Sequence, residues 1–425
     1  MKVGILGLGY VGLPLISAFC KEGISCIGFD IDEERVKLIS EAKSFLDDPS
    51  SSDLKSFIKD GKLEVTTDFS RIKEVDHVAI CVPTPIDEHR KPDLNYVVNS
   101  VKSISKHLSK GTLISLESTT YPGTTREILK PIIENENFEI GKDIFLAFSP
   151  EREDPGNKEF NLSNTPKVVS GLTNACCEKA EKFYGKICKN IVKVSSLEVA
   201  ETTKLLENIQ RSVNIGLMNE MKIFAEEMDI NLFEVIDAAS TKPFGFSKYY
   251  PGPGVGGHCI PIDPFYLTYK AKELNVDTRF IELAGEINRS MPNFVVKNIS
   301  NTLNANKLSI SCSKILCLGL SYKKNVADTR ESPPIEIFDM LKNKGGAIDF
   351  SDPHLERFPP TKKYKYTDKS ISICEENLKN YDLVVILTDH DDFDYDLILN
   401  CSKKIIDTRG RYHSMGIESE KIIVS

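Results

Sequence analysis

Short apolar runs alternate with amphipathic segments over roughly the first 150 residues of the chain. These runs are VGILGL, SCIGFD, HVAICV, TLISLE and DIFLAF, and segments of helical composition separate them. The alternation predicts β-strands joined by helices in a mostly parallel sheet. Because such sheets bind ligands at the carboxyl ends of their strands, we expect functional residues directly after these runs.

The strand rhythm stops near residue 195, and the stretch from there to Met228 has the periodicity of one long helix. Its apolar stripe is Leu205, Leu206, Ile209, Val213 and Leu217. A second strand-and-turn rhythm follows in KILCLGL, AIDFSDP, DLVVILTD and KKIIDTRG. We therefore predict an α/β domain over residues 1–195, a helical domain over 196–305, and a smaller α/β domain over 306–425.

Composition narrows the class of protein. Of the 425 residues, 40% are hydrophobic and 27% charged, which is ordinary for a folded soluble protein. A net charge of −8 argues against a nucleic-acid or membrane-surface partner, since both need a concentrated basic face.

The cysteine pattern and the start of the chain bear on compartment and metal content. The eleven cysteines form no CxxC pair and no Cys/His ligand spacing, so we expect no structural metal and mostly free thiols. The chain enters its first apolar run without the features of a signal peptide, and we expect a cytoplasmic protein.

The first apolar run leads into GLGYVG at residues 7–12, where a helix is expected to begin. In that context the glycines indicate a pyrophosphate bound at a helix N-terminus. Asp30 ends the next run, 18 residues after Gly12, and can bind ribose hydroxyls while repelling a 2′-phosphate, so NAD is favoured over NADP. Arg35 weakens that preference. The candidate cofactor residues here are Gly7, Gly9, Tyr10, Val11, Gly12, Asp30 and Arg35.

Two further polar loops follow strand-like runs, at Val82-Pro83-Thr84-Pro85 and Glu117-Ser118-Thr119-Thr120. At this sheet edge nicotinamide and substrate should meet, so Pro83, Thr84, Ser118 and Thr119 are candidates. The alternative is that the serine and threonines only cap helices.

The stretch from Pro251 to Pro264, PGPGVGGHCIPIDP, is too rich in glycine and proline to form a helix or strand over most of its length. It delivers Cys259 and Asp263, four residues apart, to one place. A solvated linker is the alternative, but the aromatic residues that flank the loop argue against it. They are Phe244, Phe246, Tyr249, Tyr250, Phe265 and Tyr266.

A cysteine near a hydride acceptor permits an oxidation by four electrons. Its thiolate can add to an aldehyde, and the resulting thiohemiacetal can lose a second hydride to give a thioester. Hydrolysis then needs an activated water and a stabilised oxyanion, roles that suit Asp263, Glu151 and a cation. Lys204, Asn208 and Arg211 share one face of the long helix, and its lysine and arginine can supply that cation; the alternative is that this is simply a solvated polar face.

Together GLGYVG, SPER, AETTKLLEN, PGPGVGGHCIPID and GLSYKKNVADTRES resemble the UDP-glucose/GDP-mannose dehydrogenase family over nearly the whole chain. The resemblance implies two Rossmann-like doubly wound domains joined by a helical dimerisation region with a long helix. It also implies a homodimer that uses NAD and a UDP-sugar. Because the turn at Gly319-Leu320-Ser321 lacks GxGxxG, the C-terminal domain is expected to take the uridine nucleotide.

Carried over by position, the resemblance implies Cys259 as nucleophile and Lys204 and Asn208 as oxyanion stabilisers. Asp263, Thr119 and Glu151 would handle water and protons, and Arg330 would reach the cofactor. The residues expected to hold the UDP-sugar lie on the long helix, the loop from Phe244 to Gly254, and elsewhere: Arg152, Lys204, Asn208, Arg211, Tyr249, Tyr250, Gly252, Gly254 and Lys323.

The segment STKPFGFSKYYPGPGVGGHCIPIDPFYL is most similar to the UDP-N-acetylglucosamine 6-dehydrogenase branch, which serves surface-polysaccharide precursors. Arg152, and Asp154-Pro155-Gly156 after it, depart from the UDP-glucose branch. UDP-N-acetylmannosamine and UDP-glucose remain alternative substrates. A two-electron hydroxy-acid dehydrogenase and an NAD(H)-sensing binding protein remain alternative functions. A Cys259–His258 dyad is disfavoured, because neighbours on a loop point apart.

Overall fold

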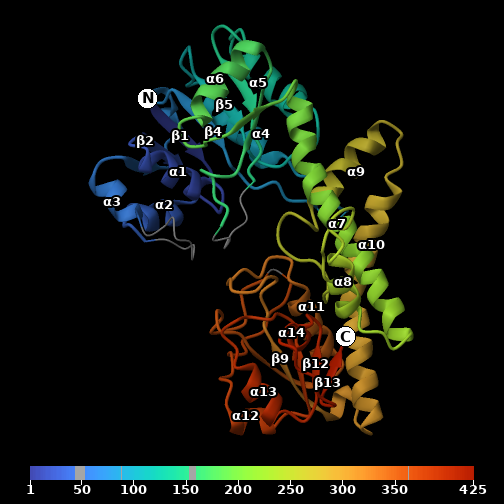
Figure 1. Cartoon of the computed structure of the whole chain (residues 1–425). Coiled ribbons are helices and arrows are strands. Elements are labelled where there is room, and N and C mark those ends of the chain that lie inside the picture. The colour runs from blue at the N-terminus through green and yellow to red at the C-terminus, as the bar shows by residue number, and fades with distance from the viewer. Residues whose placement is uncertain (44–52, 88, 153–158, 362) are drawn as a thin grey trace. The chain divides into compact units, whose positions relative to one another are not determined.

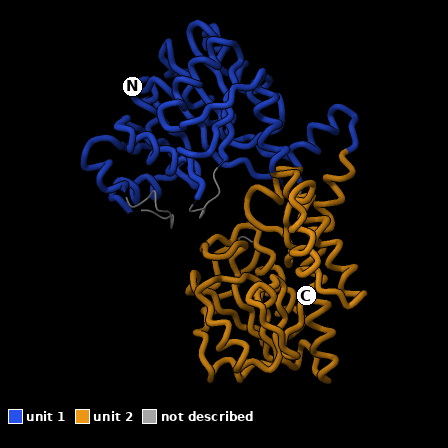
Figure 2. Tube along the Cα trace, in the orientation of Figure 1, with its two compact units in different colours: residues 1–207, 265–277 blue, residues 208–264, 278–425 orange. Residues whose placement is uncertain are grey.

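The computed structural model describes residues 1–43, 53–87, 89–152, 159–361 and 363–425. The chain divides into two compact units, residues 1–207 with 265–277 and residues 208–264 with 278–425 (Figure 2). The long helix α7, Leu197–Glu227, begins in the first unit and ends in the second. Asp154-Pro155-Gly156, which entered the substrate argument, lies outside the described residues.

The first unit contains an eight-stranded sheet in the order β3-β2-β1-β4-β5-β6-β7-β8 (Figure 1). All neighbours are parallel except β6 and β7. Its elements are β1 Lys2–Leu6, α1 Gly12–Lys21, β2 Ser25–Phe29, α2 Glu33–Ser40, α3 Leu54–Lys59, β3 Leu63–Thr66, a 3₁₀ helix Phe69–Glu74, β4 His77–Ile80, α4 Asn95–Ser105, β5 Leu113–Leu116, a π-helix Thr125–Leu129, α5 Lys130–Glu134, β6 Phe145–Phe148, β7 Lys167–Gly171, α6 Asn174–Tyr184 and β8 Ile191–Lys193.

Two hydrophobic cores form on opposite faces of this sheet. Val3 and Ile5 of β1 pack with side chains of α1 and α6, whereas Leu6 packs with side chains of α4 and α5. Because side chains alternate across a strand and both faces are covered, the central strands are apolar at nearly every position. That is why their sequences appear as unbroken apolar runs.

The second unit contains a five-stranded parallel sheet in the order β10-β9-β11-β12-β13. Helices α10 and α11 pack against one core, and α12, α13 and α14 contribute to another. The elements after α7 are α8 Leu232–Ser240, α9 Asp263–Glu273, α10 Arg279–Ala305, a 3₁₀ helix Ile310–Cys312, β9 Lys314–Leu318, α11 Pro333–Asn343, β10 Ala347–Ser351, α12 Glu375–Lys379, β11 Leu383–Ile386, α13 Tyr395–Cys401, β12 Ile405–Asp407, α14 Arg411–Ser414 and β13 Ile422–Val424.

The predicted fold class is confirmed, with two Rossmann-like α/β sheets and a helical region between them in the chain. Each of the nine apolar runs contains a strand, and the long helix forms as predicted. The sequence reading missed β3, β7, β8 and β13. Three of these, β3, β8 and β13, are edge strands with few buried side chains, so their apolar signal is weak. The fourth, β7, begins with a buried lysine, Lys167.

One expectation about α7 was wrong. Leu206 and Leu217 of the predicted apolar stripe are exposed, at 63% and 51%, whereas Lys204 and Asn208 of the predicted polar face are buried. The helix therefore points polar side chains into the protein, because they find hydrogen-bond partners there.

Candidate functional site

The glycine turn after β1 forms a cradle with little room for side chains. Gly7 has φ +92°, and a Cβ there would lie 2.6 Å from the Cys81 carbonyl oxygen. A Cβ on Gly12 would lie 1.9 Å from the Gly7 oxygen, while Gly9 faces open space. Among the described residues, no side chain caps the first turn of α1, so its backbone N–H groups can bind an anion. The turn fits the pyrophosphate of a dinucleotide.

Asp30, directly after β2, is buried and tied to this turn. Its Oδ2 accepts a hydrogen bond from Leu8 N at 2.9 Å, and its Oδ1 accepts one from Asp32 N at 3.1 Å. Arg35 also donates from Nη1 to Asp30 Oδ2 at 3.1 Å. The arginine therefore contacts the same carboxylate that the sequence predicts to bind the cofactor ribose.

We expect a preference for NAD over NADP of at least about tenfold, because the Asp30 carboxylate repels a 2′-phosphate and its pairing with Arg35 partly neutralises the arginine. Initial rates with each cofactor give the two kcat/KM values. Arg35→Ala is the matched variant, and it should leave the preference intact or increase it. Equal kcat/KM values in the wild-type protein would show that Arg35 outweighs Asp30.

The two polar loops expected beside the cofactor follow neighbouring parallel strands. Ser118 N donates to Ile80 O at 3.2 Å, and Ser118 Oγ donates to Val82 O at 2.7 Å. Thr84 and Ser118 are buried, Thr119 is partly exposed, and Pro83 is exposed. Since β4 and β5 end at the same sheet edge as β1, both loops lie at the edge that carries the glycine turn.

The SPER segment after β6 is held by α7 within the first unit. Lys204 Nζ lies 3.4 Å from Glu151 Oε2, and both side chains are largely buried. Arg152 pairs with Glu207, with Nη2 2.6 Å from Oε1, so the arginine expected to hold substrate is also engaged by the protein. A base and a cation therefore lie side by side at Glu151 and Lys204.

Sequence reasoning missed Glu201, one turn before Lys204 on α7. Its buried carboxylate accepts hydrogen bonds from Gly123 N at 2.6 Å, from Thr125 N at 2.9 Å and from Thr125 Oγ1 at 2.7 Å. Burial raises the pKa of Glu201 to about 7, against the effect of these donors. Glu201 therefore holds the segment that follows Thr119 against α7.

Sequence reasoning also missed a cluster of three polar side chains, Glu117, Lys167 and Tyr184, at the sheet edge where β5 ends. Lys167 at the start of β7 forms an ion pair with Glu117, and Tyr184 of α6 donates to the same carboxylate. Nothing in the local sequence around Glu117 or around Lys167 indicates that these two residues pair.

In the second unit, the glycine-rich loop remains irregular up to Ile262, as predicted, and α9 begins at Asp263. Cys259 is exposed, and its carbonyl accepts a hydrogen bond from Asp263 N at 2.8 Å. Asp263 is 3% exposed, and its Oδ2 accepts a hydrogen bond from Asn208 Nδ2 at 2.5 Å. One backbone turn at the end of the loop thus carries an exposed cysteine and, four residues later, a buried, hydrogen-bonded carboxylate.

The glycines of this loop admit close neighbours from the same unit. Gly257 N donates to Arg330 O at 2.9 Å, and a Cβ on Gly256 would lie 2.6 Å from Tyr322 Cβ. Burial lowers the pKa of His258, and the nearby positive charge of Arg330 lowers it further. Both effects favour the neutral form of the imidazole that precedes the cysteine.

The predicted substrate loop is anchored at its two tyrosines and at Gly252. Tyr249 OH donates to Gln210 Oε1 at 3.1 Å, and Tyr250 OH lies 2.5 Å from Asp237 Oδ1. Gly252 N donates to Asn219 Oδ1 at 3.0 Å.

Two more neighbours limit the space around the glycines of this loop. A Cβ on Gly252 would lie 2.8 Å from Arg409 Nη1, and one on Gly254, whose φ is +130°, would lie 3.0 Å from Pro333. Arg409 follows β12 and is a further cation against this loop that the sequence did not reveal.

The C-terminal unit repeats the backbone device of the cofactor turn. Leu320 N donates to Asp352 Oδ2 at 2.8 Å, and His354 N donates to Asp352 Oδ1 at 2.9 Å, as Leu8 and Asp32 do to Asp30. Here, however, His390 Nε2 lies 3.3 Å from Asp352 Oδ2, and both side chains are fully buried. The Asp352 carboxylate is thus bound by groups of the protein itself and is not left to bind a ribose, which fits the absence of GxGxxG from this turn.

The remaining predicted residues of this unit lie on different elements. Lys323 is partly buried in the loop after β9, and Arg330 donates from Nη2 to Asp328 Oδ2 at 2.6 Å. Arg211 is exposed on α7, one turn beyond Asn208.

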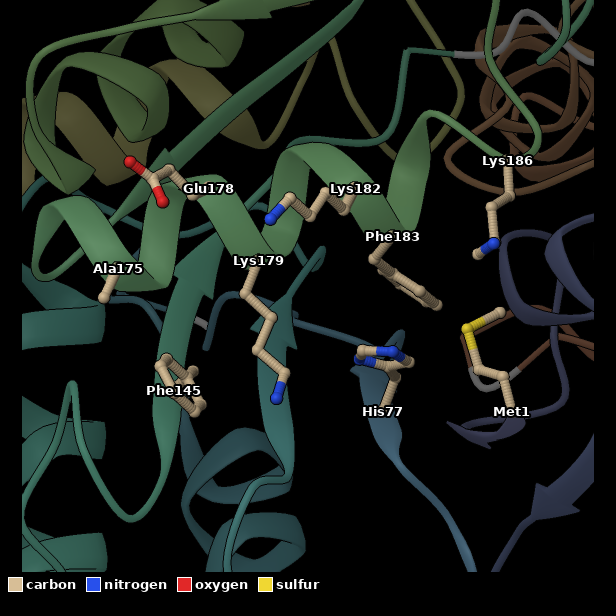
Figure 3. Close-up of a pocket in the computed structure, with 9 residues that line it drawn as sticks. All are labelled: Met1, His77, Phe145, Ala175, Glu178, Lys179, Lys182, Phe183 and Lys186. Carbon is tan, nitrogen blue, oxygen red and sulfur yellow. The ribbon is translucent and has the colours of Figure 1, made fainter.

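A hollow of about 480 Å³ lies at the opposite, amino edge of the first sheet (Figure 3). Lysines of α6 and aromatic rings line it, and Lys179 Nζ lies 4.2 Å from the centroid of the Phe145 ring. Burial lowers the pKa of His77 in its wall to about 4. The hollow is separated from the glycine turn by the length of the strands.

The described residues include neither a membrane-spanning helix nor a cluster of metal ligands. No helix among them is both long and apolar enough to cross a membrane. Across the same stretches of chain, no group of three or more His, Cys, Asp or Glu side chains could hold a metal ion.

The glycine turn, its acid and the polar loops at the same sheet edge define a dinucleotide-dependent oxidoreductase. Three family models match the chain in order. They are the NAD binding domain, the central domain and the UDP binding domain of the UDP-glucose/GDP-mannose dehydrogenase family, at residues 1–188, 198–290 and 316–414. The chain belongs to this family, as the sequence motifs predicted, and its cofactor is NAD.

The relatives are similar over nearly their whole lengths. The chain is 36% identical to Protein CapL of Staphylococcus aureus, over 92% of this chain and 90% of that protein. It is 34% identical to the UDP-N-acetyl-D-glucosamine 6-dehydrogenase of Pseudomonas aeruginosa, over 92% and 91%. The structure of a UDP-D-ManNAc dehydrogenase from Pyrococcus horikoshii matches with a TM-score of 0.87 and 32% identity, over 96% and 95%.

Proposed function

We propose that this protein oxidises C6 of a UDP-N-acetylhexosamine, in the first place UDP-N-acetylglucosamine, to the uronic acid. The observation that carries this proposal is the exposed Cys259 on a glycine loop, four residues before the buried Asp263. A dehydrogenase that stops at the aldehyde has no use for a thiol delivered in this way.

The balanced reaction converts one alcohol, two NAD and one water into one carboxylate, two NADH and three protons. NAD accepts the two hydrides. The Cys259 thiolate adds to the C6 aldehyde and keeps it bound as a thiohemiacetal, whose oxidation gives a thioester. Water then attacks the thioester carbon, the C–S bond breaks, and the thiol is regenerated.

The other catalytic roles follow from charge and hydrogen bonding. Lys204 and Asn208 donate to the oxyanions that form on C6, because a cation and an amide in a buried site stabilise developing negative charge. Asp263, Glu151 and Thr119 move the protons of the alcohol and of the attacking water. Within the first unit, the pairing of Lys204 with Glu151 supports this division of roles.

The UDP-sugar is held by residues from several elements. We assign this role to Arg152, Arg211, Tyr249, Tyr250, Gly252, Gly254 and Lys323, together with Lys204 and Asn208. Arg330 contacts the cofactor. The anchored backbone of the substrate loop supports its part in this assignment, because a fixed loop loses little entropy when the sugar binds.

An acetamido sugar is favoured over glucose by two arguments. Arg152 departs from the UDP-glucose branch, and relatives at 34% and 36% identity include an enzyme named for UDP-N-acetylglucosamine. Relatives named for UDP-N-acetylmannosamine are equally similar, so the epimer at C2 remains the alternative. Their substrates differ only in the direction of the acetamido group.

The test is a panel of UDP-N-acetylglucosamine, UDP-N-acetylmannosamine, UDP-N-acetylgalactosamine and UDP-glucose, with NADH and uronic acid both measured. We expect two NADH for each acid, and a kcat/KM for the preferred acetamido sugar roughly 10- to 100-fold above that for UDP-glucose, since a pocket shaped for the acetamido group is left with an unpaired polar group. One NADH per product would indicate a two-electron dehydrogenase. Binding without NADH would indicate a sensor. Fastest turnover with UDP-glucose would overturn the branch assignment.

We further propose a cytoplasmic homodimer that supplies precursors of surface polysaccharides, with domains at residues 1–195, 196–305 and 306–425. Exposed apolar side chains in the second unit support self-association: Leu217, Phe224, Met228, Phe280 and Leu283. Gly216 packs against Ala284 within that unit, so α7 and α10 are neighbours there; Leu217 and Phe224 lie on α7, Met228 directly follows it, and Phe280 and Leu283 lie on α10.

A further inference from the structure

A buried ion pair lies beneath the edge of the first sheet that carries the proposed chemistry. Lys167 Nζ is 2.6 Å from Glu117 Oε2, and the two side chains are 2% and 1% exposed. Glu117 directly follows β5, and Lys167 is the first residue of β7.

Both charged groups have further hydrogen-bond partners. Lys167 Nζ donates to Pro150 O at 3.1 Å, and Tyr184 OH donates to Glu117 Oε1 at 2.7 Å. Burial acts to lower the pKa of Lys167, but the adjacent Glu117 carboxylate outweighs it and raises that pKa. The lysine is therefore a fixed cation.

Stability alone is a weak reason for such a pair. Removing two charges from water costs nearly as much as their attraction returns, and an apolar pair of similar volume often serves as well or better. What an ion pair with directed hydrogen bonds adds is a defined position for the groups it joins.

The groups that Lys167 joins are the two loops proposed to carry proton-transfer residues. Glu117 lies two residues before Thr119, and Pro150 lies directly before Glu151. The attachment is reciprocal, because Arg152 Nη1 donates to Pro166 O at 2.6 Å, next to Lys167. The start of β7 therefore holds the segment around Glu151 from both sides.

We propose that Lys167 is a positioning residue, which fixes the loops of Thr119 and Glu151 relative to each other through Glu117 and the Pro150 carbonyl. This inference rests on the proposed function, because the distance between Thr119 and Glu151 matters only if both residues act in that reaction. Displacement of a reacting group by about 1 Å costs roughly a hundredfold in rate.

The test is the charge-balanced double variant Lys167→Met/Glu117→Gln, which leaves no unpaired buried charge and keeps an acceptor for Tyr184. We expect kcat with the preferred UDP-sugar to fall by about 10- to 100-fold, while KM for the sugar and Kd for NAD change by less than about threefold. The single variant Lys167→Arg, which keeps the cation and its hydrogen-bond donors, should have a kcat much closer to that of the wild-type protein than the double variant has. Glu117→Gln alone, which keeps the bond to Pro150, should lower kcat less than the double variant does.

The matched control is Ile104→Ala, which truncates a fully buried residue near the C-terminal end of α4 and destabilises the same unit. It should lower the Tm but leave kcat per folded molecule unchanged. Wild-type kcat in a folded double variant or in folded Glu117→Gln would overturn the positioning role. The proposed function fails differently, since the wild-type protein itself would then form no acid from any sugar of the panel.

Discussion

We expect Cys259→Ala to form no uronic acid from the preferred UDP-sugar, while it binds that sugar with nearly unchanged affinity. The thiol makes its decisive interaction only after the first oxidation, so its loss removes the thiohemiacetal and leaves ground-state binding intact. Because Cys259 is exposed on an irregular loop, alanine there costs little packing. Acid is measured by chromatography and sugar binding by calorimetry.

The matched control is Cys312→Ala, which removes another exposed thiol of the same unit from a 3₁₀ helix far along the chain from the glycine loop. It should keep full activity. Near-normal acid formation by Cys259→Ala would assign the nucleophile to another residue, and loss of sugar binding in that variant would mean that the loop had collapsed.

The second large effect is expected at Lys204. We expect Lys204→Ala to lower kcat by about 100- to 1,000-fold, because removing a donor to a developing oxyanion in a buried site costs roughly 3 to 4 kcal/mol. Lys204 is only 6% exposed and lies 3.4 Å from Glu151, so its charge is held rather than solvated. Single-turnover kinetics with each variant separate this loss from changes in substrate affinity.

A control for charge removal is Lys182→Ala, which deletes an exposed lysine of α6 at the opposite edge of the sheet. It should leave kcat unchanged. A Lys204→Ala variant that loses less than about threefold in kcat would show that the oxyanion is stabilised by other donors. Equal losses in both variants would point to the net charge of the protein and not to a local contact.

The sequence was most informative where one local pattern carries both structure and chemistry. The apolar run, the GLGYVG turn and Asp30 lie within 30 residues, and each predicts the next, because a buried strand, a glycine turn and an acid after the following strand form one βαβ unit. The same holds for the glycine-rich loop, whose composition excludes helix and strand around Cys259. The helix from Leu197 to Glu227 was also predictable from its periodicity.

Periodicity misled at one place, the face of α7. Leu206 and Leu217 were expected to be buried on a face opposite Lys204 and Asn208, but the structure exposes both leucines and buries the lysine and the asparagine. A hydrophobic pattern predicts burial from the average preference of each residue type for water. A lysine or asparagine can nevertheless be buried when segments distant in the sequence supply its hydrogen-bond partners.

What the sequence determined by itself, therefore, is the nine strands that form apolar runs, the long helix, the glycine-rich turns and loops, and the kinds of chemical groups that these elements carry. Tertiary structure alone decided which of those groups meet. Lys167 finds Glu117 across 50 residues of chain, Thr125 finds Glu201 across 76, and His390 finds Asp352 after an intervening strand and helix. The physical reason is that apolar burial leaves a periodic pattern within a few residues of sequence, whereas a buried polar contact depends on two groups that only the folded chain brings within contact distance of each other.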